Sequence, residues 1–418
     1  MSEANQKVVE QYALNEIPQS ERQSWGSIAL IWIGSMICVP SLMIGGLLVS
    51  GLTVTNALIA GVIGYLIVVI YMCFQGMQAS DTGLPTVSAA AQSFGKKGSR
   101  IVISLILGIA CLGWFGFQAN VCGSAFSGIM ASAFNLNIPI PVSSFMWGII
   151  MLITAIYGFN ALKYLNYIAV PSLILVSIYG VFASFSKFGT EILMNYTPPQ
   201  SMSMLSGIAM TVGSFALGGV IAGDYSRYAK NRKDVVKSSV FGVIPAGFAM
   251  ITMGGIMSLV SGTYDISIVL TDLGVPAFGL IALILATWTT NTINAYSGGL
   301  AITNLFNLDD SKRSIATAVA GIAGTLLAVF GIINYFVGFL SLLTSAVPPV
   351  AGIMIAEYWI VNKGEASTFT AKKGIDYAAV AAWLIGSLVA IYFKWGIQPV
   401  NGIVVSMVIY LISKKISK

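Results

Sequence analysis

The chain has 418 residues, of which 56% are hydrophobic and 9% charged, and its 21 Lys and Arg against 15 Asp and Glu give a formal net charge of +6. Soluble domains carry about 25% charged residues, so this composition excludes a soluble globular protein and indicates an integral membrane protein. A transmembrane barrel is disfavoured too, because its alternating segments of about ten residues do not occur here.

Apolar segments long enough to cross the hydrocarbon as helices, which requires about 20 residues, recur along the whole chain. They predict one all-α polytopic membrane domain over 27–413, preceded by a polar tail at 1–26 and followed by a short tail at 414–418. The twelve predicted spans are 27–50, 54–77, 99–131, 143–159, 162–185, 203–226, 236–261, 274–303, 314–333, 335–360, 375–393 and 397–413.

The distribution of cations predicts the orientation of these spans. With an internal N-terminus, all but two of the 21 Lys and Arg residues fall in cytoplasmic segments, and only Lys187 and Lys394 lie outside. Positive residues are retained on the cytoplasmic side, so both termini are predicted to be cytoplasmic and the chain to lie in the cell membrane. The net positive charge follows from this topology and does not indicate a nucleic-acid partner.

The first span, WIGSMICVPSLMIGGLL, contains a Gly-Ser pair at Gly34, then Pro40, then a Gly-Gly pair at Gly45. The sixth span, MTVGSFALGGVIAGDYSR, repeats this order with a Gly-Ser pair at Gly213 and a Gly-Gly pair at Gly218. The two spans are five apart, an odd number, so the second copy is inverted in the membrane. Paired interrupted spans in two halves indicate a transporter's binding site, although glycine pairs also simply permit close helix packing.

In the third span, the segment CLGWFGFQAN places Trp114 near the membrane centre, with Gln118 one helical turn later on the same face. Trp normally prefers the membrane interface, so a central Trp indicates either packing or an aromatic wall of a binding site. Phe215, beside the interruption in the sixth span, can supply a second wall. Flat bases are held by aromatic stacking and read by amide side chains, which suits a neutral nucleobase.

The eighth span contains an unusually polar segment, LATWTTNTINAYSGG. The hydroxyls of Thr289 and Thr290 follow the carbonyl of Ala286 by one turn, and Asn291 and Asn294 add a polar face. Hydroxyls and the carbonyls of an interrupted helix can together bind a small hard cation. The alternatives are that the hydroxyls bond to carbonyls of their own helix and that the Asn residues join helices.

Charged residues are missing from the middle of every predicted span, and His is absent from the chain. Asp224 and Glu357 come closest to the membrane centre, but both lie at cytoplasmic ends and are interpreted as helix caps or ion-pair partners. A proton-coupled carrier usually needs a titratable group on its path, and an intramembrane enzyme needs a general base. The sequence therefore favours a neutral substrate, and a coupling ion held by uncharged oxygens.

These segments resemble the nucleobase–cation symporter-1 family, and within it the cytosine permease branch. The likeness covers the leader NEIPQSERQSW, the first-span PSLMIGG, the third-span GWFG, the sixth-span VGSF and AGDYSRYAKN, the eighth-span WTTN and the tenth-span FVGFLSLLTSAVPPVAGIMIAEYW. The resemblance implies alternating access and ten helices in a five-plus-five inverted repeat like that of the leucine transporter. Repeat one would cover about 27–185, repeat two about 203–360 and two extra helices about 375–413.

The resemblance also implies a sodium site. By position, the family's sodium ligands correspond to the backbone carbonyls of Gly34, Ile37 and Ala286 and to the hydroxyls of Thr289 and Thr290. Sodium is then the coupling ion, and no resident cofactor is implied.

For the substrate, the resemblance implies a ring stacked between Trp114 and Phe215, with Asn291 hydrogen-bonding its edge. The chain departs from the cytosine branch at Cys111, where that branch carries Gln, and at Leu217, where it tends to carry Ser. The predicted substrate-binding residues are Trp114, Gln118, Phe215, Ser214, Asn291, Asn294 and Cys111.

We therefore expect a monomeric sodium-coupled importer of a neutral nucleobase, hydantoin or related ring, and not an enzyme. One alternative is a proton-coupled or uncoupled carrier of a related heterocycle, whose uptake would be indifferent to sodium. A second alternative is a membrane receptor or channel, which would bind a ligand or pass current without concentrating a substrate.

Overall fold

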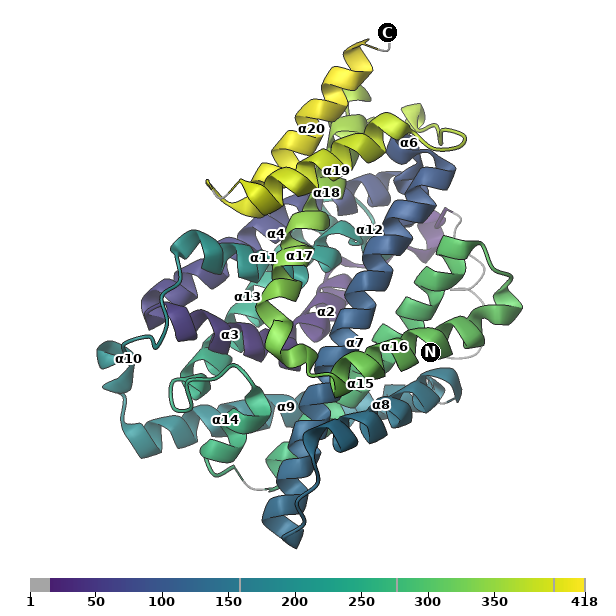
Figure 1. The fold of residues 1–418 in the computed structure, drawn as a ribbon. Helices are drawn as coiled ribbons and strands as arrows, with labels where there is room; N and C mark the ends of the chain where they lie inside the picture. The colour runs from purple at the N-terminus through teal and green to yellow at the C-terminus, as the bar shows by residue number, and fades with distance from the viewer. Residues whose placement is uncertain (1–15, 158, 276, 394, 417–418) are drawn as a thin grey trace.

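A computed structural model describes residues 16–157, 159–275, 277–393 and 395–416 (Figure 1). In this part of the chain the regular structure is helical, and the only β contact is an isolated bridge between Gln23 and Ala229. The longer helices are α2 (Trp25–Met36), α3 (Val39–Gly51), α4 (Val54–Thr82), α7 (Lys96–Phe134), α8 (Ile140–Tyr157), α9 (Phe159–Phe188), α11 (Met204–Val220), α13 (Arg232–Ser258), α15 (Ala277–Phe306), α16 (Arg313–Val329), α17 (Phe336–Ala346), α18 (Pro348–Ile355), α19 (Tyr377–Tyr392) and α20 (Gln398–Ile416). Short segments are η1 (Gln19–Glu21), α5 (Thr86–Ala89), α6 (Ala91–Phe94), α10 (Ile192–Asn195), α12 (Gly223–Ser226), α14 (Ile266–Asp272), η2 (Asp310–Lys312), η3 (Ile332–Tyr335), η4 (Ala356–Val361) and η5 (Ala366–Thr368).

Each predicted span overlaps one or more helices. Among the described residues, eight helices are long and apolar enough to cross a membrane, and the bent pair α2–α3 would make a ninth crossing. The shorter apolar helices α11, α16 and α19 occupy further predicted spans. The chain is thus an all-α polytopic membrane protein, as predicted. Lys394 and most of the N-terminal tail, on which the orientation prediction also draws, lie outside the described residues.

Both spans with paired glycines are interrupted. α2 ends at Met36 and α3 begins at Val39, with an angle of 58° between them. Pro40 explains this break, because proline lacks a backbone N–H and is accepted in the first turn of a helix but not in its interior. In α11, Phe215 has non-helical angles, φ −128° and ψ 15°, and the helix ends at Val220 before the short α12. The predicted pair of interruptions is therefore confirmed.

The helices form two groups. In the first, α13 packs against α2, α3 and α4, and α4 packs against α11. A Cβ at Gly254 would lie 2.1 Å from the Leu42 carbonyl oxygen, so the backbones of α13 and α3 are in direct contact, as small residues permit in membranes. In the second group, the long α7 runs along α15, and both contact α8 and α16 (Figure 1). The interrupted helices belong to the first group.

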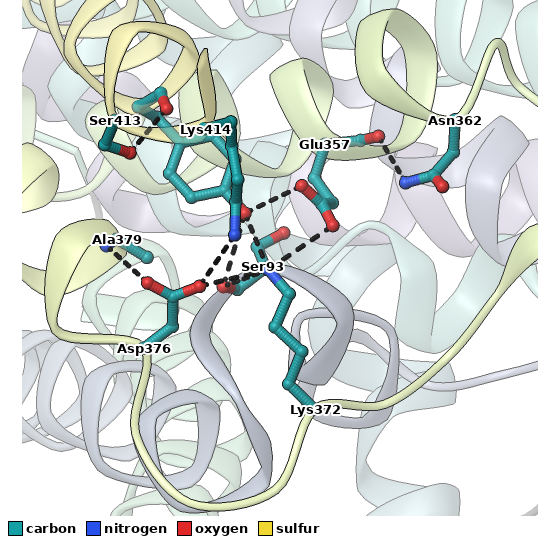
Figure 2. Close-up of polar contacts among 9 residues, drawn as sticks. Ser93, Glu357, Asn362, Lys372, Asp376, Ala379, Ser413 and Lys414 are labelled. Carbon is teal, nitrogen blue, oxygen red and sulfur yellow. Dashed lines mark hydrogen bonds and ion pairs between the residues drawn. The ribbon is translucent and has the colours of Figure 1, made fainter. Parts of the chain in front are cut away.

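The C-terminal helices α19 and α20 are attached through a buried polar cluster, which Figure 2 shows. Tyr410 Oη donates to Glu357 Oε2 at 2.7 Å, and Lys372 Nζ lies 3.4 Å from Glu357 Oε1. Asp376 Oδ2 pairs with Lys372 Nζ at 3.0 Å and with Lys414 Nζ at 2.9 Å. Glu357 is therefore an ion-pair partner, as predicted, and it fastens α20 to the segment that follows α18.

A second polar cluster joins Tyr358, the residue after Glu357, to the first helix group. Tyr358 Oη donates to Asp81 Oδ2 at 2.7 Å, and Arg232 Nη2 donates to the same oxygen at 2.7 Å. Asp224 accepts a hydrogen bond from the backbone N–H of Thr86 at 2.7 Å, which confirms its prediction as a capping residue. These carboxylates hold helix ends together, so they are not available as counter-ions for a substrate.

Candidate functional site

A cavity of about 210 Å³ lies where the two groups of helices meet. Sites for drug-sized ligands usually measure roughly 300–1,000 Å³, so this cavity suits a small single-ring compound. Of the described residues that line it, none carries a formal charge. They are Trp32, Ser35, Met36, Cys38, Pro40, Ser41, Tyr65, Trp114, Gln118, Ser214, Phe215, Leu217, Gly218, Ile221, Tyr225, Thr290 and Asn294.

The two predicted aromatic walls both line this cavity. The ring of Trp114 is packed edge-on against Phe339 at 5.2 Å and against Phe336 at 6.2 Å between ring centroids. Phe215 lies at the interruption of α11, and its ring is perpendicular to that of Trp32 at 6.2 Å. These perpendicular contacts are favourable for aromatic pairs, so neighbouring rings hold both walls in place before a ligand enters.

Polar groups of the cavity come from both helix groups. Gln118 is 2% exposed, and its Oε1 has no hydrogen-bond partner. Asn294 Nδ2 donates to Asn291 Oδ1 at 3.2 Å. Ser214 Oγ donates to the carbonyl of Thr211 at 2.7 Å, so its lone pairs are left to accept. The cavity thus offers amide and hydroxyl groups beside aromatic rings, which is the chemistry required to bind a polar flat ring.

Two predicted substrate residues do not line the cavity. Asn291 is fully buried, and its Nδ2 donates to the carbonyl of Phe115 at 3.0 Å, so it joins α15 to α7 and supports Asn294 from behind. Cys111 is buried in the contact between the same two helices, where a Cβ at Gly298 would lie 3.5 Å from the Cys111 Cβ. Both belong to the wall behind the cavity.

The predicted sodium ligands on α15 lie close together. The hydroxyls of Thr289 and Thr290 both donate to the carbonyl oxygen of Ala286, at 3.1 Å and 3.0 Å. This is the bonding to the helix's own carbonyl that the sequence left as an alternative. A hydroxyl that donates its hydrogen still has lone pairs for a cation, so this bonding is compatible with the predicted role of the three oxygens.

The break between α2 and α3 leaves two carbonyls without their helical donors. The Cys38 N–H, which would bond the Gly34 carbonyl in a continuous helix, donates to Met36 O at 3.0 Å. The Ser41 N–H, which would bond the Ile37 carbonyl, donates to Cys38 O at 3.1 Å. Carbonyls at the end of a helix need another partner, and Gly34 and Ile37 are the two positions implied by the family resemblance.

Several lining residues lie outside the predicted set, notably Trp32, Ser41, Tyr65 and Tyr225. Trp32 and Ser41 flank the break in the first span, and Tyr225 follows the interruption of α11. Tyr65 lies in the middle of an apolar span, and a hydroxyl at this depth needs a partner because lipid offers none. That is the signal by which the sequence could have identified it.

Comparisons with known proteins extend over nearly the whole chain. A family described as "Permease for cytosine/purines, uracil, thiamine, allantoin" matches residues 16–412. Cytosine permease of Escherichia coli K12 is 31% identical over 96% of this chain and 93% of its own. Hydantoin permease of Microbacterium maritypicum is 25% identical, covering 92% of this chain and 84% of its own.

Solved structures of a transporter share the fold. The inward-facing conformation of Mhp1 has a TM-score of 0.85 at 23% identity, covering 97% of this chain and 94% of that chain. Mhp1 in a closed conformation, with bromovinylhydantoin bound, has a TM-score of 0.77 at 22% identity, covering 96% of this chain and 94% of that chain. The second structure is described as a nucleobase-cation-symport-1 family transporter.

Proposed function

Because the chain belongs to the family of permeases for cytosine/purines, uracil, thiamine and allantoin, we propose that it imports a small neutral heterocycle, a nucleobase or a hydantoin-like ring, by sodium-coupled alternating access. It is a transporter and not an enzyme. The cavity lies between the two helix groups, so a movement of one group against the other would open it first to one side of the membrane and then to the other.

The cavity's lining carries this proposal. Trp114 and Phe215 provide aromatic surface, Gln118 and Asn294 provide amides, and none of the described lining residues carries a charge. A charged substrate would be buried there without a counter-ion, at a high cost in free energy. A purely apolar substrate would leave the Gln118 oxygen unpaired. A neutral ring with N–H and C=O groups on its edge satisfies both conditions.

Binding of bases by the purified protein tests this proposal. Calorimetric titration with cytosine, uracil, hydantoin and allantoin should show that at least one of them binds, and Trp114→Ala should weaken its affinity by about 5–150-fold, because stacking contributes about 1–3 kcal/mol per base. Trp288→Ala is a matched control, since Trp288 packs on Trp147 and does not line the cavity. No binding of any of the four rings, or equal affinity in Trp114→Ala, would contradict the proposal.

Sodium coupling is the finer part of the proposal. It is supported by the clustered oxygens of Ala286, Thr289 and Thr290 on α15 and by the carbonyls of Gly34 and Ile37, whose helical donors bond elsewhere. Oxygens without formal charge are ligands suited to a hard monovalent cation at a broken helix. Each of these ligands is neutral, so the bound cation would add a positive charge beside the substrate cavity, which Thr290 also lines.

Uptake into proteoliposomes with and without a sodium gradient tests the coupling. Wild-type protein should concentrate the substrate only with the gradient, and the double variant Thr289→Ala with Thr290→Ala should lose this dependence. Thr292→Ala is the control, because its hydroxyl donates to Trp288 O on the same helix, away from the proposed ligands. Uptake that ignores sodium in the wild type would favour the proton-coupled or uncoupled carrier, and binding without uptake would favour a receptor.

A further inference from the structure

Unpaired polar atoms distinguish the central cavity from two further cavities of the described residues. A cavity lined by Ser124 and Ser267, and an apolar cavity lined by Trp383, contribute no buried side-chain nitrogen or oxygen without a partner. The central cavity contributes three, Trp32 Nε1, Tyr65 Oη and Gln118 Oε1. Buried polar atoms are normally hydrogen-bonded, so three unpaired atoms around one cavity indicate a ligand that pairs with them.

Tyr65 is the least expected of the three. It is 1% exposed, and its ring is seated on α13, where a Cβ at Gly247 would lie 2.5 Å from the ring. The ring position is therefore fixed by close packing, which phenylalanine would provide equally well. Tyr65 lines the cavity together with Ser41 and Ser214 from the two interrupted helices, and its buried hydroxyl has no hydrogen-bond partner. Packing alone thus explains the ring but not the hydroxyl.

Tyr71, on the same helix, shows the ordinary arrangement. It is 2% exposed, and its hydroxyl donates to the carbonyl of Ala216 at 3.1 Å. It does not line the cavity. α4 therefore carries two buried tyrosines, one with a hydrogen bond to the protein and one whose hydroxyl lies near the Ser41 and Ser214 hydroxyls without forming a hydrogen bond to either.

We propose that Tyr65 is a substrate-binding residue, whose hydroxyl bonds a second polar edge of the ring that Gln118 reads from another side. This inference rests on the proposed function. Gln118 lies on α7, which packs along α15, whereas Tyr65 lies on α4, which packs against α11 and α13, so the two groups belong to different walls. Gln118 Oε1 is an acceptor, Trp32 Nε1 is a donor and a tyrosine hydroxyl can be either. The site therefore prefers rings with N–H and C=O groups on two edges, such as cyclic ureides and pyrimidine bases, over rings that are polar on one edge.

The test compares Tyr65→Phe with Tyr71→Phe. For the tightest binder among cytosine, uracil, hydantoin and allantoin, Tyr65→Phe should weaken affinity by about 5–150-fold, the effect of leaving one buried polar group unpaired. The melting temperature of the ligand-free Tyr65→Phe protein should match or exceed that of the wild type, because no hydrogen bond of the folded protein is removed. Tyr71→Phe should do the opposite, lowering the melting temperature and leaving affinity unchanged.

Wild-type affinity in Tyr65→Phe, or a loss of melting temperature equal to that of Tyr71→Phe, would overturn the assignment. If Tyr65→Phe retained affinity while Trp114→Ala lost it, the proposed function would stand and only the role of Tyr65 would be refuted. If none of the four rings bound to the wild type, the proposed function itself would be refuted.

Discussion

Tyr410→Phe removes one hydroxyl from the polar cluster that fastens α20 to the end of α18. The Tyr410 ring is fully buried, and its hydroxyl donates to Glu357 at 2.7 Å. The nearest remaining partner of that carboxylate is Lys372, at 3.4 Å. A hydrogen bond to a charged group contributes about 1.5–3 kcal/mol, and the carboxylate is too buried for water to replace the bond fully. We expect a loss of about 1.5–3 kcal/mol in the free energy of unfolding, measured by denaturant titration in detergent.

Tyr358→Phe is the matched control for this loss. Tyr358 is equally buried and also donates to a carboxylate at 2.7 Å, that of Asp81. Asp81, however, keeps hydrogen bonds of 2.7 Å and 3.0 Å from Arg232, so the same change should cost less. Neither variant should alter substrate affinity, since neither residue lines the cavity. An equal or larger loss in Tyr358→Phe would refute the reasoning that the remaining partners of the carboxylate set the magnitude.

Three further predictions concern the loop between α13 and α14, the helix contacts and the topology. Burial raises the pKa of Asp265, and hydrogen bonds from Ser267 oppose this shift. A carboxyl whose pKa is raised in the folded state stabilises the protein at pH values below its unfolded-state pKa. This stabilisation is lost as the pH rises through the folded-state pKa. The melting temperature of the wild type should therefore fall as the pH rises from about 4 to 7, and Asp265→Asn should reduce this dependence. A wild-type melting temperature that does not change with pH would contradict this prediction. Gly254→Ala should lower the melting temperature, since its Cβ would meet a carbonyl at 2.1 Å, whereas Gly338→Ala, with nothing within 4 Å, should not; equal effects would refute the close-contact argument. A cysteine introduced by Lys373→Cys should not react with membrane-impermeant thiol reagents in intact cells, because residue 373 is predicted to be cytoplasmic. Labelling of this cysteine from outside would contradict the predicted topology.

The sequence determines the membrane class and the positions of the helices because both depend on local hydrophobicity. About 20 apolar residues must form a helix in the bilayer, so each predicted span overlaps one or more helices. Pro40 and the repeated glycine pairs likewise predict the interruptions, since proline removes a backbone donor wherever it stands. The absence of charges from the span centres predicts a neutral substrate. None of these predictions depends on which helices pack against one another.

For several polar residues, only the tertiary structure decides whether the side chain faces the cavity. Asn291 and Asn294 are both polar residues of one span, yet the first is bonded to Phe115 behind the wall and the second lines the cavity. Tyr65 and Tyr71 are equally buried on one helix, and only the packing of α11 gives Tyr71 a carbonyl partner. The sequence sets the polarity of each residue, but the rotation and neighbours of each helix decide whether its polar group meets protein or ligand.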